Sequence, residues 1–295
     1  TSALDNQDRE NYNKDVTAAR GTLEYTPTDD LFFKLTWDKT KDDSNSKGGY
    51  RLLPSLLTDA PVPDSKYDSY TSLPTKNNVE LEGYSFTARW DVSNSTSIKY
   101  VGSNRDSYSP TNIDFDNTSI RIFDVPAIYD DEQTTHELQV NHQGDNYKLV
   151  SGLYYYDGES CGQFEAILEE LGKSLGAAGL TREVSGCSNS TSKAAYMQGT
   201  YDFDEQWSMT LGARYTRDSK EATVNNGLVF ATVYPESGWI PGYVRPEGQL
   251  VPTVLDDNED WSRFTPRAGV EYQYNPDILF FASYAQGFKS GTFNP

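Results

Sequence analysis

The stretch AAYMQGTYDFDEQWSMTLGARYTRDSKE, residues 194–221, indicates the fold class. In its second part, every other residue is apolar, namely Trp207, Met209, Leu211, Ala213 and Tyr215. The residues between them are small, polar or basic, which is the period of two that a β-strand imposes on its two faces. A short polar break at 203–206 separates this strand from an extended run at 195–202. The stretch therefore predicts a hairpin with a tight turn.

Four further hairpins follow the same pattern, so that tight turns are expected near positions 28, 94, 144, 205 and 275. The connections between hairpins are long and polar, at 41–80, 109–132, 158–193 and 222–260. Outer-membrane barrels have this asymmetry of short periplasmic turns and long extracellular loops, whereas a soluble β-sandwich has no reason to confine long loops to one end. The sequence therefore predicts an all-β fold, a transmembrane antiparallel β-barrel.

The alternation assigns side chains to the two faces of that barrel. The polar parity faces the lumen and includes three arginines, Arg89, Arg214 and Arg267, which are expected to pair with lumen carboxylates rather than to contact a plug or a ligand. The apolar parity is expected to face lipid, and its members are Leu31, Phe33, Leu35, Trp37, Tyr84, Phe86, Trp90, Trp207, Met209, Leu211 and Tyr215.

About ten strands can be counted, and strand edges are costly in hydrocarbon because unpaired backbone groups find no partner there. The strands could close as a ten-stranded barrel, or they could form an arc of a larger one. The chain ends at 293–295 directly after a strand, which favours the arc.

The composition narrows the class of protein. The net charge is −19 and the pI about 4.4, which argues against a nucleic-acid partner because phosphate binding needs a basic surface. Apolar runs such as 278–282 are much shorter than the ~20 residues of a membrane helix. A mean hydropathy of −0.69 excludes a helical membrane protein. It leaves room for a barrel, in which only alternate residues meet lipid.

Two cysteines, Cys161 and Cys187, lie in one predicted loop. An isolated pair suits a disulfide better than a zinc site, and a disulfide indicates an oxidising compartment such as the periplasm or cell surface. Two buried thiols are the alternative. Apolar residues within the loop recur at helical spacing and predict a short amphipathic helix that orders the loop: Phe164, Ile167, Leu168, Leu171 and Leu175.

Three stretches resemble the barrels of TonB-dependent outer-membrane receptors: THELQVNHQGDNYKLVSGLYYYDGES (135–160), AAYMQGTYDFDEQWSMTLGARYTRD (194–218) and RFTPRAGVEYQYNPDILFFASYAQGFKSGTFNP (263–295). The resemblance implies a plugged 22-stranded barrel in the bacterial outer membrane, in contact with lipid and lipopolysaccharide. It also implies import of a scarce, bulky nutrient, with energy from the TonB complex acting through the plug. We expect residues 1–295 to form the middle of the barrel, without the plug domain and the C-terminal strands.

Aromatic and arginine side chains in the predicted loops could form an external binding vestibule, because aromatic faces stack on sugars or catecholate rings and arginines match anionic groups. Packing among the loops is the alternative reading. The candidates are Tyr50, Arg51, Tyr67, Tyr70, Trp239, Tyr243 and Arg245.

No metal site, cofactor or enzymatic activity is expected. The acidic run 256–260 lacks the spacing and glycine of a calcium loop. His136 and His142 do not form a ligand set, and no nucleophile lies in a pattern with a base. The leading functional hypothesis is energised import, most of all of a ferric siderophore. The alternatives are glycan uptake, a passive porin or adhesin, and a soluble carbohydrate-binding protein.

Overall fold

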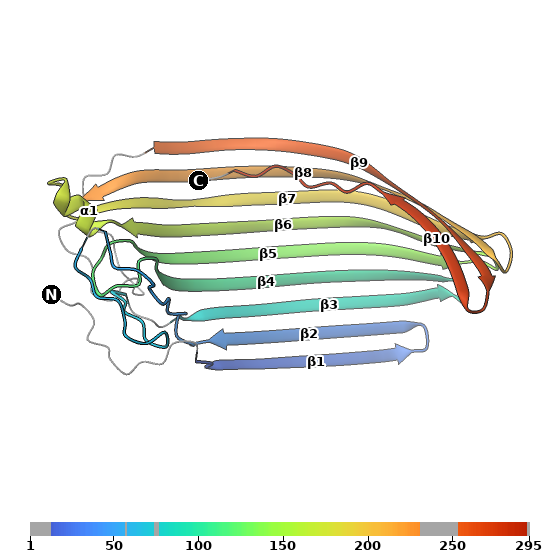
Figure 1. The fold of residues 1–295 in the computed structure, drawn as a ribbon. Helices are drawn as coiled ribbons and strands as arrows, with labels where there is room; N and C mark the ends of the chain where they lie inside the picture. The colour runs from blue at the N-terminus through green and yellow to red at the C-terminus, as the bar shows by residue number, and fades with distance from the viewer. Residues whose placement is uncertain (1–12, 57, 74–76, 231–252, 294–295) are drawn as a thin grey trace.

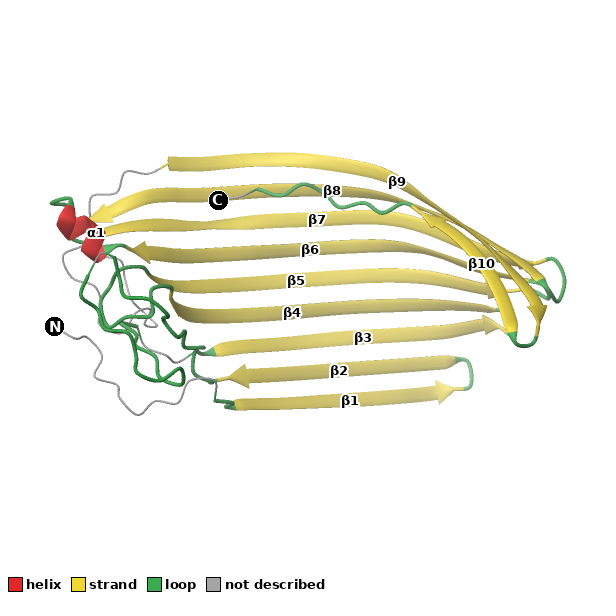
Figure 2. Cartoon of the chain, viewed as in Figure 1, coloured by secondary structure: helices red, strands yellow, loops and turns green. Residues whose placement is uncertain are grey.

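A computed structural model describes residues 13–293, apart from 57, 74–76 and 231–252. The described chain forms one ten-stranded antiparallel sheet in which every strand pairs with its neighbours in sequence (Figures 1 and 2). The strands are β1 (Val16–Thr28), β2 (Leu31–Asp42), β3 (Val79–Ser93), β4 (Thr96–Asp114), β5 (Asp124–Gln143), β6 (Tyr147–Ile167), β7 (Leu180–Asp202), β8 (Trp207–Phe230), β9 (Thr253–Asn275) and β10 (Ile278–Ala285).

The sheet is open within the described residues, because β1 pairs only with β2 and β10 pairs only with β9. It curves around a hollow, so that β10 swings in front of the central strands (Figure 1). The predicted all-β, antiparallel class is confirmed. Among the described residues, no helical segment has the length and apolarity needed to cross a membrane as a helix.

Five short connections lie at one end of the sheet, which we call the tight-turn end (Figure 1). They comprise residues 29–30, 94–95, 144–146, 203–206 and 276–277, where the tight turns were expected. The other connections gather at the opposite end, the long-loop end. Short and long connections therefore alternate along the chain and lie at opposite ends of the sheet.

Two long loops are much shorter than the sequence predicts. Most of 109–132 and 158–193 is strand, and the actual connections are 115–123 and 168–179. The first loop, 43–78, is close to its predicted extent. The last loop was predicted at 222–260, but 222–230 and 253–260 are strand, and the remainder, 231–252, lies outside the described residues. The prediction failed because these strand extensions lack apolar alternation. Their backbones nevertheless pair as far as the strand tips, where Ile167 of β6 pairs with Asp124 of β5 and with Thr181 of β7.

The predicted amphipathic helix is also largely wrong. Helix α1 covers only Glu169–Ser174, and Phe164 and Ile167 belong to β6. Their side chains repeat at a helical spacing, but the backbone at Phe164 pairs with Val184 of β7. Ladder hydrogen bonds to two neighbouring strands therefore override the local helical pattern.

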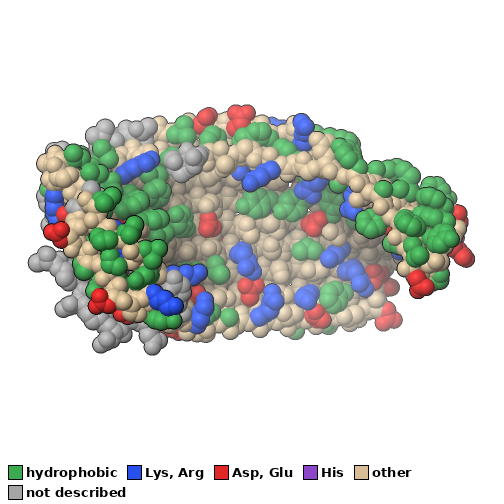
Figure 3. Space-filling view, in the orientation of Figure 1, with side chains coloured by type: hydrophobic (Ala, Val, Ile, Leu, Met, Phe, Trp, Pro, Cys, Tyr) green, Lys and Arg blue, Asp and Glu red, His purple; other side chains and the backbone are tan. Residues whose placement is uncertain are grey.

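The two faces of the sheet differ in chemistry. Directly opposite residues of an antiparallel pair share a face, so the register places all eleven residues predicted to face lipid on one side. Near the tight-turn end this side carries exposed apolar side chains, which we call the apolar band: Leu23, Tyr25, Leu35, Phe86, Trp90, Leu138, Val140, Leu153, Met197, Trp207, Leu211, Tyr215, Phe264, Val270, Phe280 and Tyr284. The other side forms the hollow, where charged and polar groups lie on the floor (Figure 3).

A small conventional core lies at the long-loop end. Its buried residues come from the tips of β5 to β8 and from the loops that cover them, and they include Leu73, Val125, Ile167, Val184 and Ala222. Loop 43–78 is tied to this end by hydrogen bonds to loop 115–123, for example from the Gly49 amide to Asn117 Oδ1 at 2.8 Å. This core positions the loops above the mouth of the hollow.

Candidate functional site

An ion cluster lies on the wall of the hollow across β1 to β4. The Arg105 guanidinium contacts both carboxylate oxygens of Asp38, at 3.0 and 3.1 Å, and Arg20 approaches the same carboxylate at 4.0 Å. Arg105 reaches across Gly83 of β3, where an added Cβ would lie only 3.0 Å from its Nη2 atom. The glycine therefore lets an arginine lie flat over one strand and bind an acid on the next.

A second cluster on the same wall joins β5 to β8. The Tyr196 hydroxyl donates a 2.6 Å hydrogen bond to Glu137 Oε1, and the ring crosses Gly152 to reach it. The Arg214 guanidinium lies 5.3 Å from the centre of the Tyr154 ring and 5.9 Å from that of Tyr196. These distances suit cation–π contact. The wall thus offers a fixed aromatic surface with a charged group on it.

The three arginines predicted to face the lumen lie on this concave side, but their partners differ. Arg89 forms the expected ion pair, with Asp91 at 2.9 Å. Arg214 instead lies over tyrosine rings and donates from Nε to Thr216 Oγ1 at 3.0 Å. Arg267 makes no ion pair within the described part of the chain. Sequence reasoning missed Arg20, Arg105 and their shared acid, although the alternating parity could have placed all of them.

The predicted vestibule residues of loop 43–78 split into two groups. Arg51 is held inside the loop cluster, because it donates to the carbonyl oxygens of Leu53 at 2.8 Å and Asp116 at 2.7 Å. Tyr50, Tyr67 and Tyr70 are exposed. Trp239, Tyr243 and Arg245 lie outside the described residues. Three exposed leucines in the same loop, which the sequence analysis did not consider, extend this surface: Leu52, Leu53 and Leu56.

The cysteines form the predicted disulfide, Cys161–Cys187. It does not pin a loop, however, because the two residues are direct partners in the β6–β7 ladder. The bond therefore links β6 to β7 covalently in the part of the sheet beyond the apolar band. The sequence could not place the disulfide between paired strands, because residues 158–193 were predicted to be a loop.

Three carboxylates converge where β4 ends and β5 begins. Oxygens of Asp114, Asp116 and Asp124 all lie within 4.8 Å of one another. Burial, reinforced by the neighbouring carboxylates, raises the pKa of Asp124 to about 8 and the pKa of Asp114 to about 6. The acidic run 256–260, by contrast, lies in strand β9. Sequence reasoning missed the cluster because Asp124 lies eight or more residues from the others.

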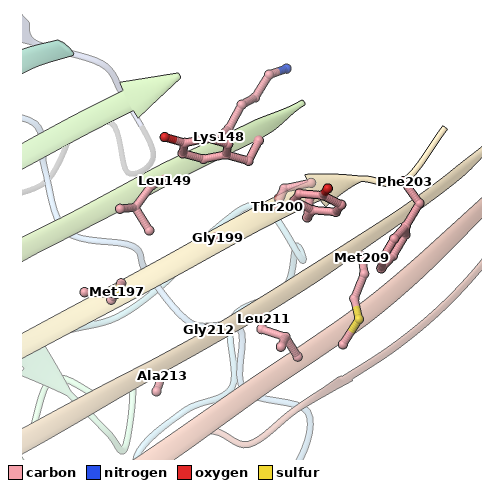
Figure 4. Close-up of a pocket in the computed structure, with 12 residues that line it drawn as sticks. Lys148, Leu149, Met197, Gly199, Thr200, Phe203, Met209, Leu211, Gly212 and Ala213 are labelled. Carbon is pink, nitrogen blue, oxygen red and sulfur yellow. The ribbon is translucent and has the colours of Figure 1, made fainter. Parts of the chain in front are cut away.

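The outer, apolar side is hollowed between β6, β7 and β8 near the tight-turn end. This groove has a volume of about 650 Å³ and is lined by residues such as Leu149, Met197, Gly199 and Leu211 (Figure 4). Figure 4 also shows successive residues of β6, Lys148 and Leu149, pointing to opposite sides of the strand. A separate polar pocket of about 610 Å³, lined by residues such as Arg89 and Asn141, lies at the tight turns.

An open antiparallel sheet with an apolar outer band, a polar concave wall and loops at one end defines the class: it is part of the wall of a large β-barrel. The sequence profile of the family described as TonB dependent receptor-like, beta-barrel, matches residues 6–295. The chain belongs to this family of receptors, which is not a family of enzymes. A comparison with curated protein sequences gave no match.

Solved structures show the same fold. The chain is similar to the ferric yersiniabactin uptake receptor of Yersinia pestis, with a TM-score of 0.64 and 11% identity over 90% of this chain and 36% of the receptor. The open form of the ferric-catecholate import receptor of E. coli K12 gives a TM-score of 0.61 and 10% identity over 92% of this chain and 46% of the receptor. The siderophore receptor of Acinetobacter baumannii gives a TM-score of 0.57 and 13% identity over 92% of this chain and 41% of the receptor. The chain spans less than half of each.

Proposed function

We propose that this chain is a wall segment of an outer-membrane importer that takes up a bulky ferric siderophore with energy from TonB. The single observation that carries the proposal is the match to the receptor family along almost the whole chain. The named ligands of the similar structures, a ferric siderophore and ferric catecholates, favour this substrate class. A plug and a contact with the TonB complex are part of the proposal.

The dimensions of the apolar band support a position in a bilayer. On β8 the band runs from Trp207 to Tyr215, which is about 26 Å along the strand. A strand tilt of roughly 40° leaves about 20 Å along the membrane normal, close to the ~25 Å band of outer-membrane barrels. Aromatic contacts border the band at the tight turns, where the ring centres of Trp207 and Tyr272 lie 4.4 Å apart.

Aromatic side chains also mark the other border. Ring contacts of 6.1 to 6.3 Å join Phe86 to Tyr100, Tyr100 to His136 and His136 to Tyr155 across four strands. Trp37 donates from Nε1 to Glu82 on the same side at 2.8 Å, at the point where charged residues begin. Two aromatic rows with apolar residues between them are typical of a barrel that spans a membrane.

The concave wall supports passage of a hydrated, functionalised ligand. Ion pairs such as Arg105–Asp38 satisfy the wall's own charges, while the Tyr154–Arg214 pair presents aromatic and cationic groups to the hollow. Catecholate and phenolate chelates carry rings and negative charge, which such groups bind. The exposed tyrosines and leucines of loop 43–78 provide a first contact surface at the mouth.

Uptake of radioactive iron tests the proposal. The gene that encodes this chain is deleted in its own bacterium, and cells are supplied with ⁵⁹Fe bound to catecholate or phenolate siderophores. We expect deletion to abolish energy-dependent uptake of at least one chelate, and the intact gene on a plasmid to restore it. Unchanged iron uptake together with lost growth on an oligosaccharide would overturn the siderophore assignment in favour of glycan import.

A variant separates the wall from the loops. Arg214→Gln, which removes the charge beside Tyr154 and Tyr196, is expected to reduce uptake without lowering the amount of receptor in the outer membrane. Lys220→Gln is the matched control, because Lys220 lies on the same strand beyond the apolar band and makes no ion pair with a described residue. Equal uptake by both variants would argue against a role for the wall cluster.

A further inference from the structure

We propose that Asp114, Asp116 and Asp124 form a calcium site that fastens loop 43–78 to the β4–β5 hairpin. The site lies at the long-loop end, where β4 ends at Asp114. Three carboxylate oxygens, one from each residue, lie within 4.8 Å of one another. An ion with ligand bonds of about 2.4 Å can contact two oxygens that are at most ~4.8 Å apart.

An orphaned buried atom points independently to a cation. Asp124 has 0% of its surface exposed, and its Oδ1 atom has no hydrogen-bond partner among the residues that the structure describes. Its other oxygen, Oδ2, accepts a hydrogen bond from the Ser72 hydroxyl. A buried carboxylate oxygen without a partner is costly, since neither water nor a donor replaces its lost hydration. A bound cation would satisfy this atom.

The three carboxylates also repel one another when they are ionised. Asp114 and Asp124 are direct partners in the β4–β5 ladder, an arrangement that is repulsive for like charges. Arg121 attracts Asp124, but its guanidinium is shared with Glu169, 3.9 Å away. Arg121 therefore compensates the charge of the cluster only in part, because it also interacts with Glu169. A divalent cation removes the repulsion that the protein itself leaves in place.

Backbone amides hold the carboxylates in position. Asp114 Oδ1 accepts from the amides of Asp116 at 3.0 Å and Asn117 at 2.6 Å. Asp116 Oδ2 accepts from the amides of Ile122 at 3.2 Å and Phe123 at 2.7 Å. The turn is therefore arranged before any cation binds.

The donor set selects the metal. The cluster provides only carboxylate oxygens and the neighbouring Ser72 hydroxyl, and hard oxygen ligands suit calcium or magnesium rather than zinc or copper. Magnesium needs octahedral geometry with bonds of about 2.1 Å and keeps most of its waters, whereas calcium accepts irregular sites. The dry interior around Asp124, with no exposed surface, favours the ion that gives up its water more readily.

Binding would order the candidate vestibule. Ser72 contacts both outer acids, through its amide to Asp114 Oδ2 at 3.2 Å and through its hydroxyl to Asp124. Arg51 of the same loop donates to the Asp116 carbonyl oxygen at 2.7 Å. An ion between the three carboxylates would therefore fix both ends of segment 51–72, which carries the exposed Tyr67 and Tyr70.

Calorimetric titration of the purified, detergent-solubilised protein tests the site directly. The protein is freed of metal with EGTA and titrated with CaCl₂, and separately with MgCl₂. We expect one Ca²⁺ per chain, with a dissociation constant in the range of about 10⁻⁴ to 10⁻³ M known for extracellular calcium modules. No calcium binding at millimolar concentration, or equally tight Mg²⁺ binding, would overturn the assignment.

Two variants connect binding to the named residues. Asp124→Asn is expected to weaken Ca²⁺ binding about tenfold or more, whereas Asp68→Asn, an exposed acid of the same loop, should leave it unchanged. Limited proteolysis of loop 43–78 gives the second readout, with calcium-dependent protection in the wild type and in Asp68→Asn only. Without calcium, Asp124→Asn should be at least as stable as the wild type, because it removes repulsion. Unchanged calcium affinity in a folded Asp124→Asn protein would refute the site.

Discussion

The two halves of β6 have the same backbone geometry and the same neighbouring strands, but their side chains meet different surroundings. From Tyr147 to Tyr155 the outward residues are mostly apolar and at least partly exposed, with Leu153 60% accessible. From Tyr156 to Ile167 the outward residues are polar or acidic until the strand tip, where Ile167 is only 2% accessible under the loops. Pairing with β7 is continuous through both halves. Backbone pairing alone therefore maintains the strand, and the surroundings decide which residues it carries.

The largest expected effect is from a charge placed in the apolar band. Leu211→Arg should lower the free energy of unfolding from lipid vesicles by about 2–4 kcal/mol, because the side chain would meet hydrocarbon. Thr223→Arg, on the same strand and parity but beyond the band and opposite Asp256, should change it by less than about 0.5 kcal/mol. Thr210→Arg, on the concave side, should also have only a small effect on the free energy of unfolding. Equal losses in all three variants would remove the distinction between the two halves.

Loss of the disulfide should affect the outer half alone. The Cys161→Ser/Cys187→Ser double variant removes a cross-strand link closed over 26 residues and is expected to cost about 2 kcal/mol of local stability. Hydrogen exchange should accelerate in 158–193 and remain unchanged in 147–155 and 195–202. Faster exchange throughout β6 and β7 would mean that the halves do not open independently.

Glycines on the two faces should respond differently to a methyl group. Gly152→Ala would place a Cβ 2.6 Å from the Tyr196 ring and 2.8 Å from the Leu138 carbonyl oxygen, and should destabilise by about 1–2 kcal/mol. Gly199→Ala, on the outer face, meets nothing closer than 3.7 Å and should be nearly neutral. Chemical denaturation of both variants in vesicles measures the difference. A harmless Gly152→Ala would show that Tyr196 does not lie across β6.

The smallest effect is expected from the wall's ion pair. A double-mutant cycle on Asp38 and Arg105 should give a coupling of about 0.2–1 kcal/mol, because both side chains remain partly exposed to water. The coupling should fall as salt is added. A value above about 2 kcal/mol would indicate that water is excluded from this part of the hollow.

The half of the sheet that carries the apolar band was predictable from sequence, because residues such as Trp207, Met209 and Leu211 alternate with polar ones along each strand. The extensions of β4 to β9 beyond the apolar band were predicted as loops, because strands outside the band need no apolar alternation. The disulfide pairing was predicted, but its position within a ladder was not. Long-range clusters such as Tyr196 with Glu137 depend on strand register, which the sequence alone does not specify.

The central claim is that one parity of these strands meets lipid near the tight turns and meets water farther out. Nitroxide labels at single introduced cysteines along β8, with the native disulfide intact, measure this directly through collision rates with oxygen in lipid and with a nickel chelate in water. We predict strict alternation from Trp207 to Tyr215, with lipid contact at odd positions, and contact with water on both parities from Ser219 to Thr223. Uniform accessibility along β8, or lipid contact that persists to Thr223, would contradict the account.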